Sequence, residues 1–289
     1  MIIAVASGKG GTGKTTVAAS LAVTWPGPVM AVDLDVEEPN LHLFLQPEIL
    51  GTEQVTVEVP DVNEDLCTYC RKCAQLCQFK AISVMGQVIM TFPEMCHGCG
   101  GCIAICPEKA ISSDTREVGV MESGLSRGRI ACLTGRLRIG EAMSPPLMRH
   151  VRTRMLAQSA RQGCDAIVDA PPGVSCPAMT AVADADLILL VTEPTPFGFH
   201  DFALAWEAFA PYGKPMATVI NRAGLDDTRV HAFCAQHNLP VLAEIPYRRD
   251  IAEHYSHGRI LAELDPDMRR LFVDLGQNIR QNVQEAVHA

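Results

Sequence analysis

A glycine-rich run near the start of the chain has the residues and spacing needed to bind phosphate. Gly8, four further residues and then Gly13-Lys14-Thr15 fit the spacing of a phosphate-binding loop. In such a loop backbone N–H groups surround the phosphates, the lysine contacts the β- and γ-phosphates, and the following hydroxyl binds Mg²⁺. We therefore expect ATP and Mg²⁺ to be bound by Gly8, Gly10, Gly11, Thr12, Gly13, Lys14, Thr15 and Thr16.

Eight of the twelve cysteines form a second group, whose spacing is typical of metal ligands. They read Cys67-x2-Cys70-x2-Cys73-x3-Cys77 and Cys96-x2-Cys99-x2-Cys102-x3-Cys106. The second run repeats the first at an offset of 29 residues, and Lys80-Ala81-Ile82-Ser83 recurs as Lys109-Ala110-Ile111-Ser112. Two such runs favour iron–sulfur ligation, with zinc knuckles as the alternative. Gln78 follows the first run, where Pro107 follows the second, so the backbone at Cys77 is less restrained.

Acidic residues follow two short apolar segments. Asp33 and Asp35 follow residues 29–32, and Asp169 lies near the end of residues 165–170. The carboxyl ends of parallel strands meet at one edge of a sheet, so we expect these carboxylates beside the phosphate-binding loop. There they suit Mg²⁺ and the attacking water, although capping of a loop is the alternative for Asp33 and Asp35.

Several further apolar segments predict the scaffold that positions these groups. We expect buried parallel strands at residues 2–6, 186–192, 216–221 and 241–245, and a helix over residues 16–25. Residues 53–62 alternate as a strand, and residues 117–140 suggest a hairpin. With 289 residues, of which 48% are hydrophobic, the chain can form one large α/β domain and a small second one.

The loop contains a second lysine, Lys9, and in this it resembles the deviant Walker A ATPases, which include MinD, ParA, Mrp-type cluster carriers and the nitrogenase iron protein. The resemblance implies a mostly parallel, SIMIBI-type sheet flanked by helices. It also implies a homodimer, or a heterodimer with a related ATPase, in which Lys9 reaches the partner's phosphates. The implied catalytic residues are Lys9, Lys14 and Asp35, where Asp35 orients the water.

The same resemblance assigns the remaining nucleotide contacts. Asp33 and Asp169 would act on Mg²⁺, Gly173 would sense the γ-phosphate through its N–H, and Asn221 with Pro246, Tyr247 and Arg248 would surround adenine. The iron protein has an aspartate at the place of Pro39, so magnesium coordination can differ here.

The cysteine repeat resembles the bacterial ferredoxin module, a small α+β fold with two [4Fe–4S] clusters. In that module the fourth cysteine of each run serves the other cluster. The resemblance implies one cluster on Cys67, Cys70, Cys73 and Cys106, and the other on Cys96, Cys99, Cys102 and Cys77. We predict a ferredoxin-like domain at residues 61–114, inserted into an ATPase domain of residues 1–60 and 115–289.

The other four cysteines lack ligand spacing. Cys176 stands seven residues after Asp169, where the nitrogenase iron protein has a ligand of a shared cluster, but the Cys-Pro-x-Cys pair of Mrp carriers is absent. We interpret Cys176 as a small buried or half-buried thiol, and Cys132, Cys164 and Cys234 as core residues.

Charge and hydropathy limit the partners. A net charge of −9 disfavours nucleic acid, because duplex binding depends on neutralised phosphates. We see no secretory signal and no apolar stretch of about 20 residues, and so expect a cytoplasmic protein without stable membrane insertion. The pattern Leu271, Leu275, Ile279 and Val283 predicts a final helix packed on the core rather than on a membrane.

Taken together, the motifs predict an ATP-hydrolysing iron–sulfur protein whose nucleotide-dependent dimer gates electron transfer or metal-cluster delivery to a redox or metal-cofactor partner. One alternative is an Mrp-type cluster-assembly carrier. Another is a MinD- or ParA-like positioning ATPase with a structural ferredoxin module. A third is a ligase related to cobyrinic acid amide synthases, although no glutaminase portion is visible.

Overall fold

The computed structural model describes residues 1–288, and these form two compact units. The first unit comprises Met1–Thr52, Met121–Arg136 and the chain from Met148 onward. The second comprises Glu53–Val120 and Leu137–Leu147. The second unit is thus larger than the ferredoxin-like domain expected at residues 61–114. It also takes in residues 53–60, 115–120 and 137–147, which the sequence analysis assigned to the ATPase domain. For the first two of these segments the reason is that β3 (Glu48–Val62) and β6 (Ile111–Ser126) are long neighbouring strands, each shared by the two units.

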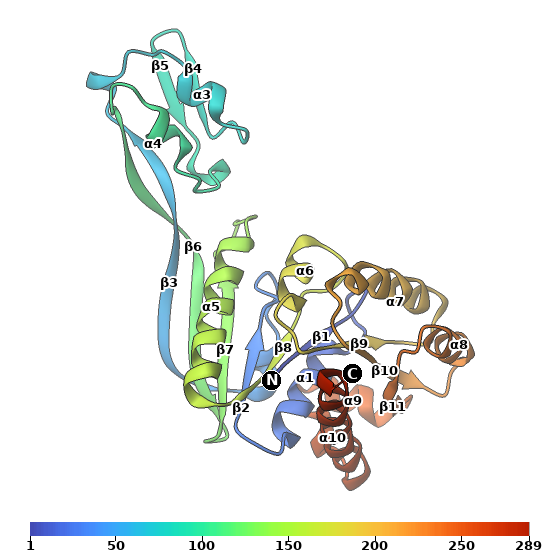
Figure 1. Cartoon of the computed structure of the whole chain (residues 1–289). Helices are drawn as coiled ribbons and strands as arrows, with labels where there is room; N and C mark the ends of the chain where they lie inside the picture. Colours follow the sequence, from blue (N-terminus) through green and yellow to red (C-terminus); the bar gives the residue numbers. More distant parts are fainter. Residues whose placement is uncertain (289) are drawn as a thin grey trace. The chain divides into compact units, whose positions relative to one another are not determined.

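The first unit is built on a largely parallel sheet (Figure 1), as the sequence predicts. The strand order of the whole sheet is β11-β10-β9-β1-β8-β2-β7-β6-β3. β1 pairs in parallel with β8 and β9, β2 with β7 and β8, and β10 with β9 and β11. The strands are β1 (Ile2–Ala6), β2 (Val29–Asp33), β7 (Ile130–Leu137), β8 (Asp165–Asp169), β9 (Leu187–Thr192), β10 (Met216–Ala223) and β11 (Val241–Pro246).

Helices cover both faces of this sheet. Figure 1 shows α1 and α10 on one face and α6 and α7 on the other. The hairpin of β6 and β7 turns at Arg127-Gly128, both with positive φ, which confirms the hairpin predicted for residues 117–140. The helices of this unit are α1 (Lys14–Thr24), α2 (Leu41–Leu45), α5 (Pro145–Gln162), α6 (Cys176–Val182), α7 (Pro196–Phe209), α8 (Thr228–Gln236), α9 (Arg249–Ser256) and α10 (Pro266–His288).

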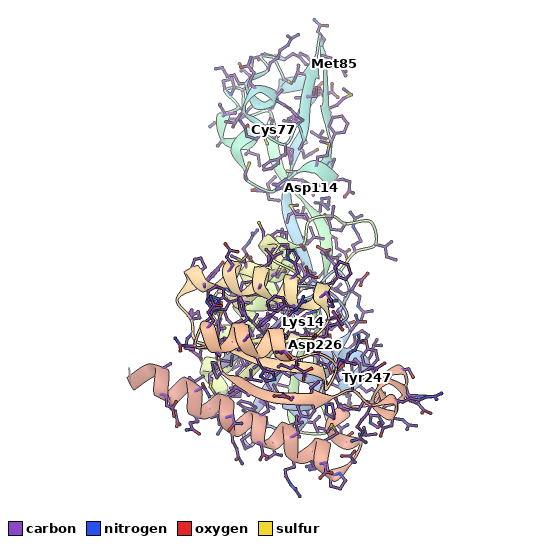
Figure 2. All side chains as sticks on the ribbon, turned by 90° about the vertical axis from the view of Figure 1, so that its right-hand side faces the viewer. Lys14, Cys77, Met85, Asp114, Asp226 and Tyr247 are labelled. Carbon is purple, nitrogen blue, oxygen red and sulfur yellow. The ribbon has the colours of Figure 1, made fainter. Side chains whose placement is uncertain are left out.

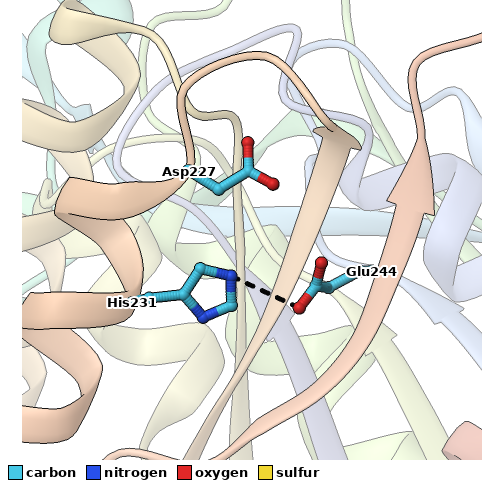
Figure 3. Close-up of side chains that lie close together, drawn as sticks. All are labelled: Asp227, His231 and Glu244. Carbon is cyan, nitrogen blue, oxygen red and sulfur yellow. Dashed lines mark ion pairs between the residues drawn. The ribbon is translucent and has the colours of Figure 1, made fainter.

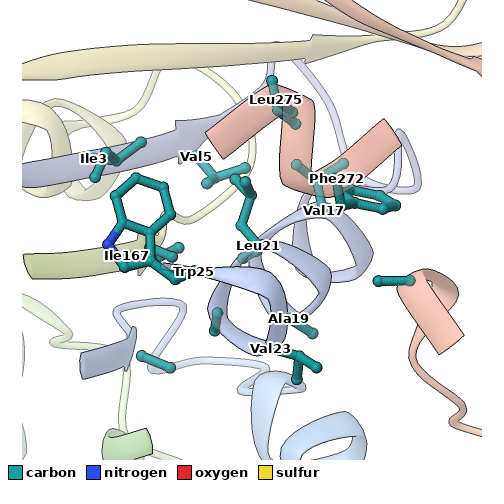
Figure 4. Close-up of a cluster of buried hydrophobic side chains, with 14 of the residues drawn as sticks. Ile3, Val5, Val17, Ala19, Leu21, Val23, Trp25, Ile167, Phe272 and Leu275 are labelled. Carbon is teal, nitrogen blue, oxygen red and sulfur yellow. The ribbon is translucent and has the colours of Figure 1, made fainter. Parts of the chain in front are cut away.

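The main hydrophobic core lies between the sheet and α1 and α10. Its side chains come from β1, β8, α1 and α10, and Trp25, Leu21 and Phe272 lie among them (Figure 4). Leu275 and Ile279 are fully buried, and Leu271 and Val283 pack against the same cluster. The last helix is therefore a core helix, as predicted. None of the helices in residues 1–288 is long and apolar enough to span a membrane.

Two helices begin earlier than the sequence suggests. α1 starts at Lys14 rather than Thr16, because Gly13 ends the loop in a left-handed conformation (φ 96°). α7 starts at Pro196 rather than near Asp201, because Thr195 caps it by accepting a hydrogen bond from the Gly198 N–H (3.0 Å) and proline suits the first turn.

The second unit consists of two structurally repeated halves. The 3₁₀ turn η1 (Glu64–Leu66) and α3 (Lys72–Leu76) recur as η2 (Pro93–Met95) and α4 (Gly101–Ile105). Positive φ angles recur in the same register, at Tyr69 and Gly98, Arg71 and Gly100, and Lys80 and Lys109. An antiparallel pair, β4 (Ile82–Met85) and β5 (Val88–Thr91), completes the unit. The repeat in the cysteine spacing is thus also a repeat in the backbone.

Candidate nucleotide site and cysteine cavities

The glycine-rich loop joins β1 to α1 at the carboxyl edge of the parallel sheet. Lys14, which is labelled in Figure 2, is the first residue of α1. Its side chain is buried. The Asn221 amide, from β10, donates a hydrogen bond to the Thr12 carbonyl (2.8 Å). A side chain at position 13 would lie 2.4 Å from that amide, so both the positive φ and the close approach require glycine here.

Asp33 and Asp169 occupy paired positions on the adjacent strands β2 and β8. Both are almost fully buried. Asp33 accepts hydrogen bonds from the N–H groups of Leu41 (2.9 Å) and Asp35 (3.1 Å), so it holds the segment that follows β2. Burial, and secondarily the charge of Asp169, raises the pKa of Asp33.

Asp169 is the better candidate for a metal ligand. Burial raises its pKa to about 6, against the opposing influence of Lys14 and a hydrogen bond from Thr15. Its Oδ1 atom is buried without a hydrogen-bond partner. A buried, unpartnered carboxylate oxygen beside a P-loop hydroxyl matches the donor chemistry that Mg²⁺ prefers.

Asp35 follows β2 and lies near Lys14 and Asp169. Burial raises its pKa to about 6, and the nearby Lys14 charge acts in the opposite direction. A carboxylate that gains and loses a proton in this range is suited to general-base work near neutral pH.

A cavity of about 400 Å³ lies next to the loop, within the range of ligand pockets. Eleven of the residues predicted to bind or act on the nucleotide line it: Gly10, Gly11, Gly13, Lys14, Thr15, Thr16, Asp35, Asn221, Pro246, Tyr247 and Arg248. Sequence reasoning missed Glu38, Asn40, Arg222 and Tyr255, which also line it. Glu38 and Asn40 closely follow Asp35 in the sequence, and Arg222 directly follows Asn221, whereas no neighbouring motif marks Tyr255.

The other predicted residues lie outside this lining. Gly8 packs against the Asp201 backbone, Thr12 and Asp33 are buried, and the Gly173 N–H donates to the Ser7 carbonyl (2.9 Å). In this conformation the Gly173 N–H is therefore not available to a phosphate. Likewise, the Asn221 amide contacts the loop, so its predicted contact with adenine stays a prediction.

Lys9 contacts its own chain. Its ammonium group forms an ion pair with Glu193, which directly follows β9. Arg222 binds the other carboxylate oxygen of Glu193 (2.7 Å). Sequence reasoning missed Glu193, because a glutamate after an apolar strand carries no motif.

The second unit contains two cavities, each lined by four of the eight clustered cysteines. One, of about 200 Å³, is lined by Cys77, Cys96, Cys99 and Cys102. The other, of about 20 Å³, is lined by Cys67, Cys70, Cys73 and Cys106. The cysteines that line each cavity are thus the set that the ferredoxin resemblance implies. Each set consists of the first three cysteines of one run and the fourth cysteine of the other run.

Backbone amides point at several of these sulfurs. The Ala81 N–H donates to Cys77 Sγ and the Ala110 N–H to Cys106 Sγ, both at 3.3 Å and in equivalent positions of the repeat. The Gly98 N–H approaches Cys96 Sγ (3.5 Å). Such contacts favour thiolates and tune bound metal centres.

None of the twelve cysteines, all of which lie in the described residues, forms a disulfide. Cys132, Cys164 and Cys234 are buried, which confirms their interpretation as core residues. The interpretation of Cys176 as a buried or half-buried thiol is wrong: it is exposed at the first residue of α6. The sequence interpretation rested on the missing second cysteine of the Mrp pair, which does not determine exposure, and the helix begins at the surface.

One polar cluster lies away from these sites. Asp227 and His231, one turn apart at the start of α8, lie close to Glu244 of β11, and His231 Nε2 is 3.3 Å from a Glu244 carboxylate oxygen (Figure 3). The Asp227 carboxylate accepts the Gly224 N–H (2.9 Å). Asp227 therefore orders the turn before α8, and the other two form a surface contact that is an ion pair only when His231 is protonated.

A family model described as the CobQ/CobB/MinD/ParA nucleotide binding domain matches residues 3–261. An uncharacterised protein of Methanocaldococcus jannaschii is 32% identical over 249 residues, covering 85% of this chain and 86% of its own. A second from the same organism is 29% identical over 266 residues, covering 89% and 90%.

Solved structures support the fold assignment. The cell division ATPase MinD of Pyrococcus furiosus is 23% identical with a TM-score of 0.58, covering 97% of this chain and 98% of its own. The septum site-determining protein MinD of Pyrococcus horikoshii, complexed with Mg-ADP, is 22% identical with a TM-score of 0.56, covering 96% and 95%. At this level of identity the likeness concerns the fold.

Proposed function

Since this chain belongs to the CobQ/CobB/MinD/ParA family of nucleotide-binding domains, we propose that it hydrolyses Mg·ATP and carries two [4Fe–4S] clusters whose use is gated by its nucleotide state. The comparisons support the nucleotide-binding half of this proposal. The iron–sulfur half depends on the cysteines alone.

The nucleotide chemistry follows from the residues around the 400 Å³ cavity. Lys14 and the loop N–H groups would hold the phosphates, while Thr15 and Asp169 would hold Mg²⁺, directly or through water. Asp35 would orient the attacking water and accept its proton. Tyr247 and Arg248 would cover the base from the loop after β11.

One observation carries the iron–sulfur proposal: each cysteine cavity is lined by three cysteines of one run and the fourth of the other. The sulfurs of Cys77, Cys96 and Cys106, each approached by a backbone N–H, are suitable ligands for iron. The larger cavity suits a cluster as it stands, whereas the smaller one requires its loops to move apart. When bound, such clusters supply one-electron transfer.

Dimerisation would link the two activities. By the resemblance above, ATP closes a dimer of this chain with itself or with a related ATPase, and hydrolysis reopens it. A redox or metal-cofactor protein would bind one state more tightly and so respond to the nucleotide. A cluster-assembly carrier is a variant of this proposal, in which the exposed Cys176 would be the thiol at the dimer interface.

A positioning ATPase is the second candidate. The solved structures with this fold include cell division MinD proteins and a ParA-family ATPase from Chlorobium tepidum. In that case the cysteine unit would serve only as structure, and the chain would move to a membrane or nucleoid surface with ATP. Vesicle and DNA co-sedimentation with ATP would support this candidate.

Anaerobic purification followed by iron and sulfide analysis tests the main proposal. We expect a brown protein with two [4Fe–4S] clusters per chain. Replacing Cys102 by alanine should remove about half of the iron, and Cys73→Ala should remove the other half.

The matched control is Cys132→Ala, which removes a buried cysteine outside both cavities. It should leave the iron content unchanged. A colourless protein without iron or sulfide, or one that holds zinc in the same sites, would rule out the iron–sulfur function while leaving the nucleotide site intact.

A further inference from the structure

We propose that Glu193 is a positioning residue that holds Lys9 against its own chain until a nucleotide-bound partner copy takes Lys9 over. The proposal rests on the ATP-dependent dimer proposed above. It adds a residue that sets how readily this dimer forms.

The Glu193 side chain is placed rigidly. It directly follows β9, at the carboxyl edge of the sheet, and only 7% of it is exposed. The Thr195 N–H donates to the Glu193 carbonyl (2.8 Å), and the Thr195 hydroxyl lies 3.3 Å from Oε1. Gly198 packs so closely that a side chain there would lie 2.4 Å from the Glu193 carbonyl oxygen. The carboxylate is therefore a fixed point to which Lys9 is attached.

Lys9 is the mobile member of the pair. Its side chain is 29% exposed, and its long stem leaves the loop without a regular element to hold it. In the proposed dimer, reaching a phosphate on the partner takes the Lys9 ammonium group away from Glu193. The two partners of Lys9 therefore compete, and a stronger bond to Glu193 must weaken the dimer.

Arg222 makes this competition reversible. It binds Oε2 of Glu193 at 2.7 Å, whereas Lys9 binds Oε1. When Lys9 leaves, the buried carboxylate keeps one cationic partner, so the large cost of an unpaired buried charge does not arise. Arg222 also lines the nucleotide cavity, next to Asn221, which contacts the loop. The carboxylate that holds Lys9 is thus joined to the wall of the nucleotide site.

Sedimentation velocity on the full chain, with a saturating non-hydrolysable ATP analogue and Mg²⁺, tests this role. Glu193→Gln keeps the shape but removes the charge that attracts Lys9. We expect the dimer dissociation constant of this variant to fall about tenfold, because each chain no longer has to break a charge-assisted bond. A merely structural residue would weaken the dimer when mutated.

Two further variants make the result specific. Glu207→Gln, an exposed position on α7, should dimerise like the wild type. In a Lys9→Ala background, Glu193→Gln should give no gain, because its effect acts through Lys9. An unchanged or weaker dimer for Glu193→Gln, or a gain that persists without Lys9, would overturn the inference. A wild-type chain that stays monomeric with the analogue would instead refute the dimer of the proposed function.

Discussion

Two buried carboxylates and one buried lysine share the end of the P-loop. Asp33 and Asp169 are paired across β2 and β8, and Lys14 is the cation that acts on Asp169. The Asp33 carboxylate accepts hydrogen bonds from the backbone N–H groups of Leu41 and Asp35, whereas the Oδ1 atom of Asp169 has no hydrogen-bond partner. The nucleotide-free chain is thus destabilised at the point where a divalent cation would restore the charge balance.

The effect of Asp169 on stability should depend on pH. Its pKa is about 6 in the folded chain and 3.8 in a model peptide, so folding disfavours the charged form. The penalty is absent below about pH 4, grows between about pH 4 and pH 6, and is complete above about pH 6. In the nucleotide-free and metal-free chain, Asp169→Asn should therefore raise the free energy of unfolding by about 3 kcal/mol at pH 8.

Urea unfolding at pH 8 and pH 5 measures this change. The gain should shrink to about half at pH 5, because the wild-type carboxylate is then largely protonated in the folded chain. Saturating Mg·ATP should reverse the order and favour the wild type. A variant that is less stable than the wild type at pH 8 would contradict the assignment of Asp169 as a strained metal ligand.

Among the elements, the contact between the P-loop and α7 depends on one glycine. A side chain at Gly8 would lie 1.9 Å from the carbonyl oxygen of Asp201, which is backbone and cannot turn aside. The first glycine of the motif is therefore needed for helix packing, in addition to the phosphate-binding role that the motif predicts. The spacing of the motif does not reveal this second requirement.

Gly8→Ala should therefore destabilise the nucleotide-free chain by about 2 to 3 kcal/mol, since the loop or α7 must shift. Gly10 is the matched control, because an added methyl group there meets nothing within 4 Å. Gly10→Ala should change stability by no more than about 0.5 kcal/mol. Thermal or urea unfolding without nucleotide compares the two, and equal losses would show that backbone freedom rather than packing is the cause.

The elements that the sequence predicted best are those with local signals. The strands at residues 2–6 and 216–221, the hairpin and the final helix follow from apolar periodicity and turn residues, and the structure confirms them. The exposure of Cys176 and the contacts of Lys9 with Glu193 depend on side chains brought together from distant parts of the chain. No local pattern contains that information.

At the scale of the whole molecule, the two units are joined by chain connectivity through β3 and β6. Each unit has its own core, and each contains one of the two proposed chemistries. Coupling between them is therefore a thermodynamic question, which can be tested without knowledge of the route through the structure.

If nucleotide state gates the clusters, the effect must be reciprocal. Suppose that the reduction potential shifts by about 30 mV when the ATP analogue binds. The analogue must then bind the reduced and the oxidised protein with affinities that differ about threefold. We expect both changes, measured by redox titration with no nucleotide, ADP and analogue, and by analogue binding to the protein in each oxidation state. Lys14→Ala should abolish both, because it removes a phosphate contact. Equal potentials in all three states, together with equal electron-transfer rates to candidate partners, would refute gating while leaving each separate site in place.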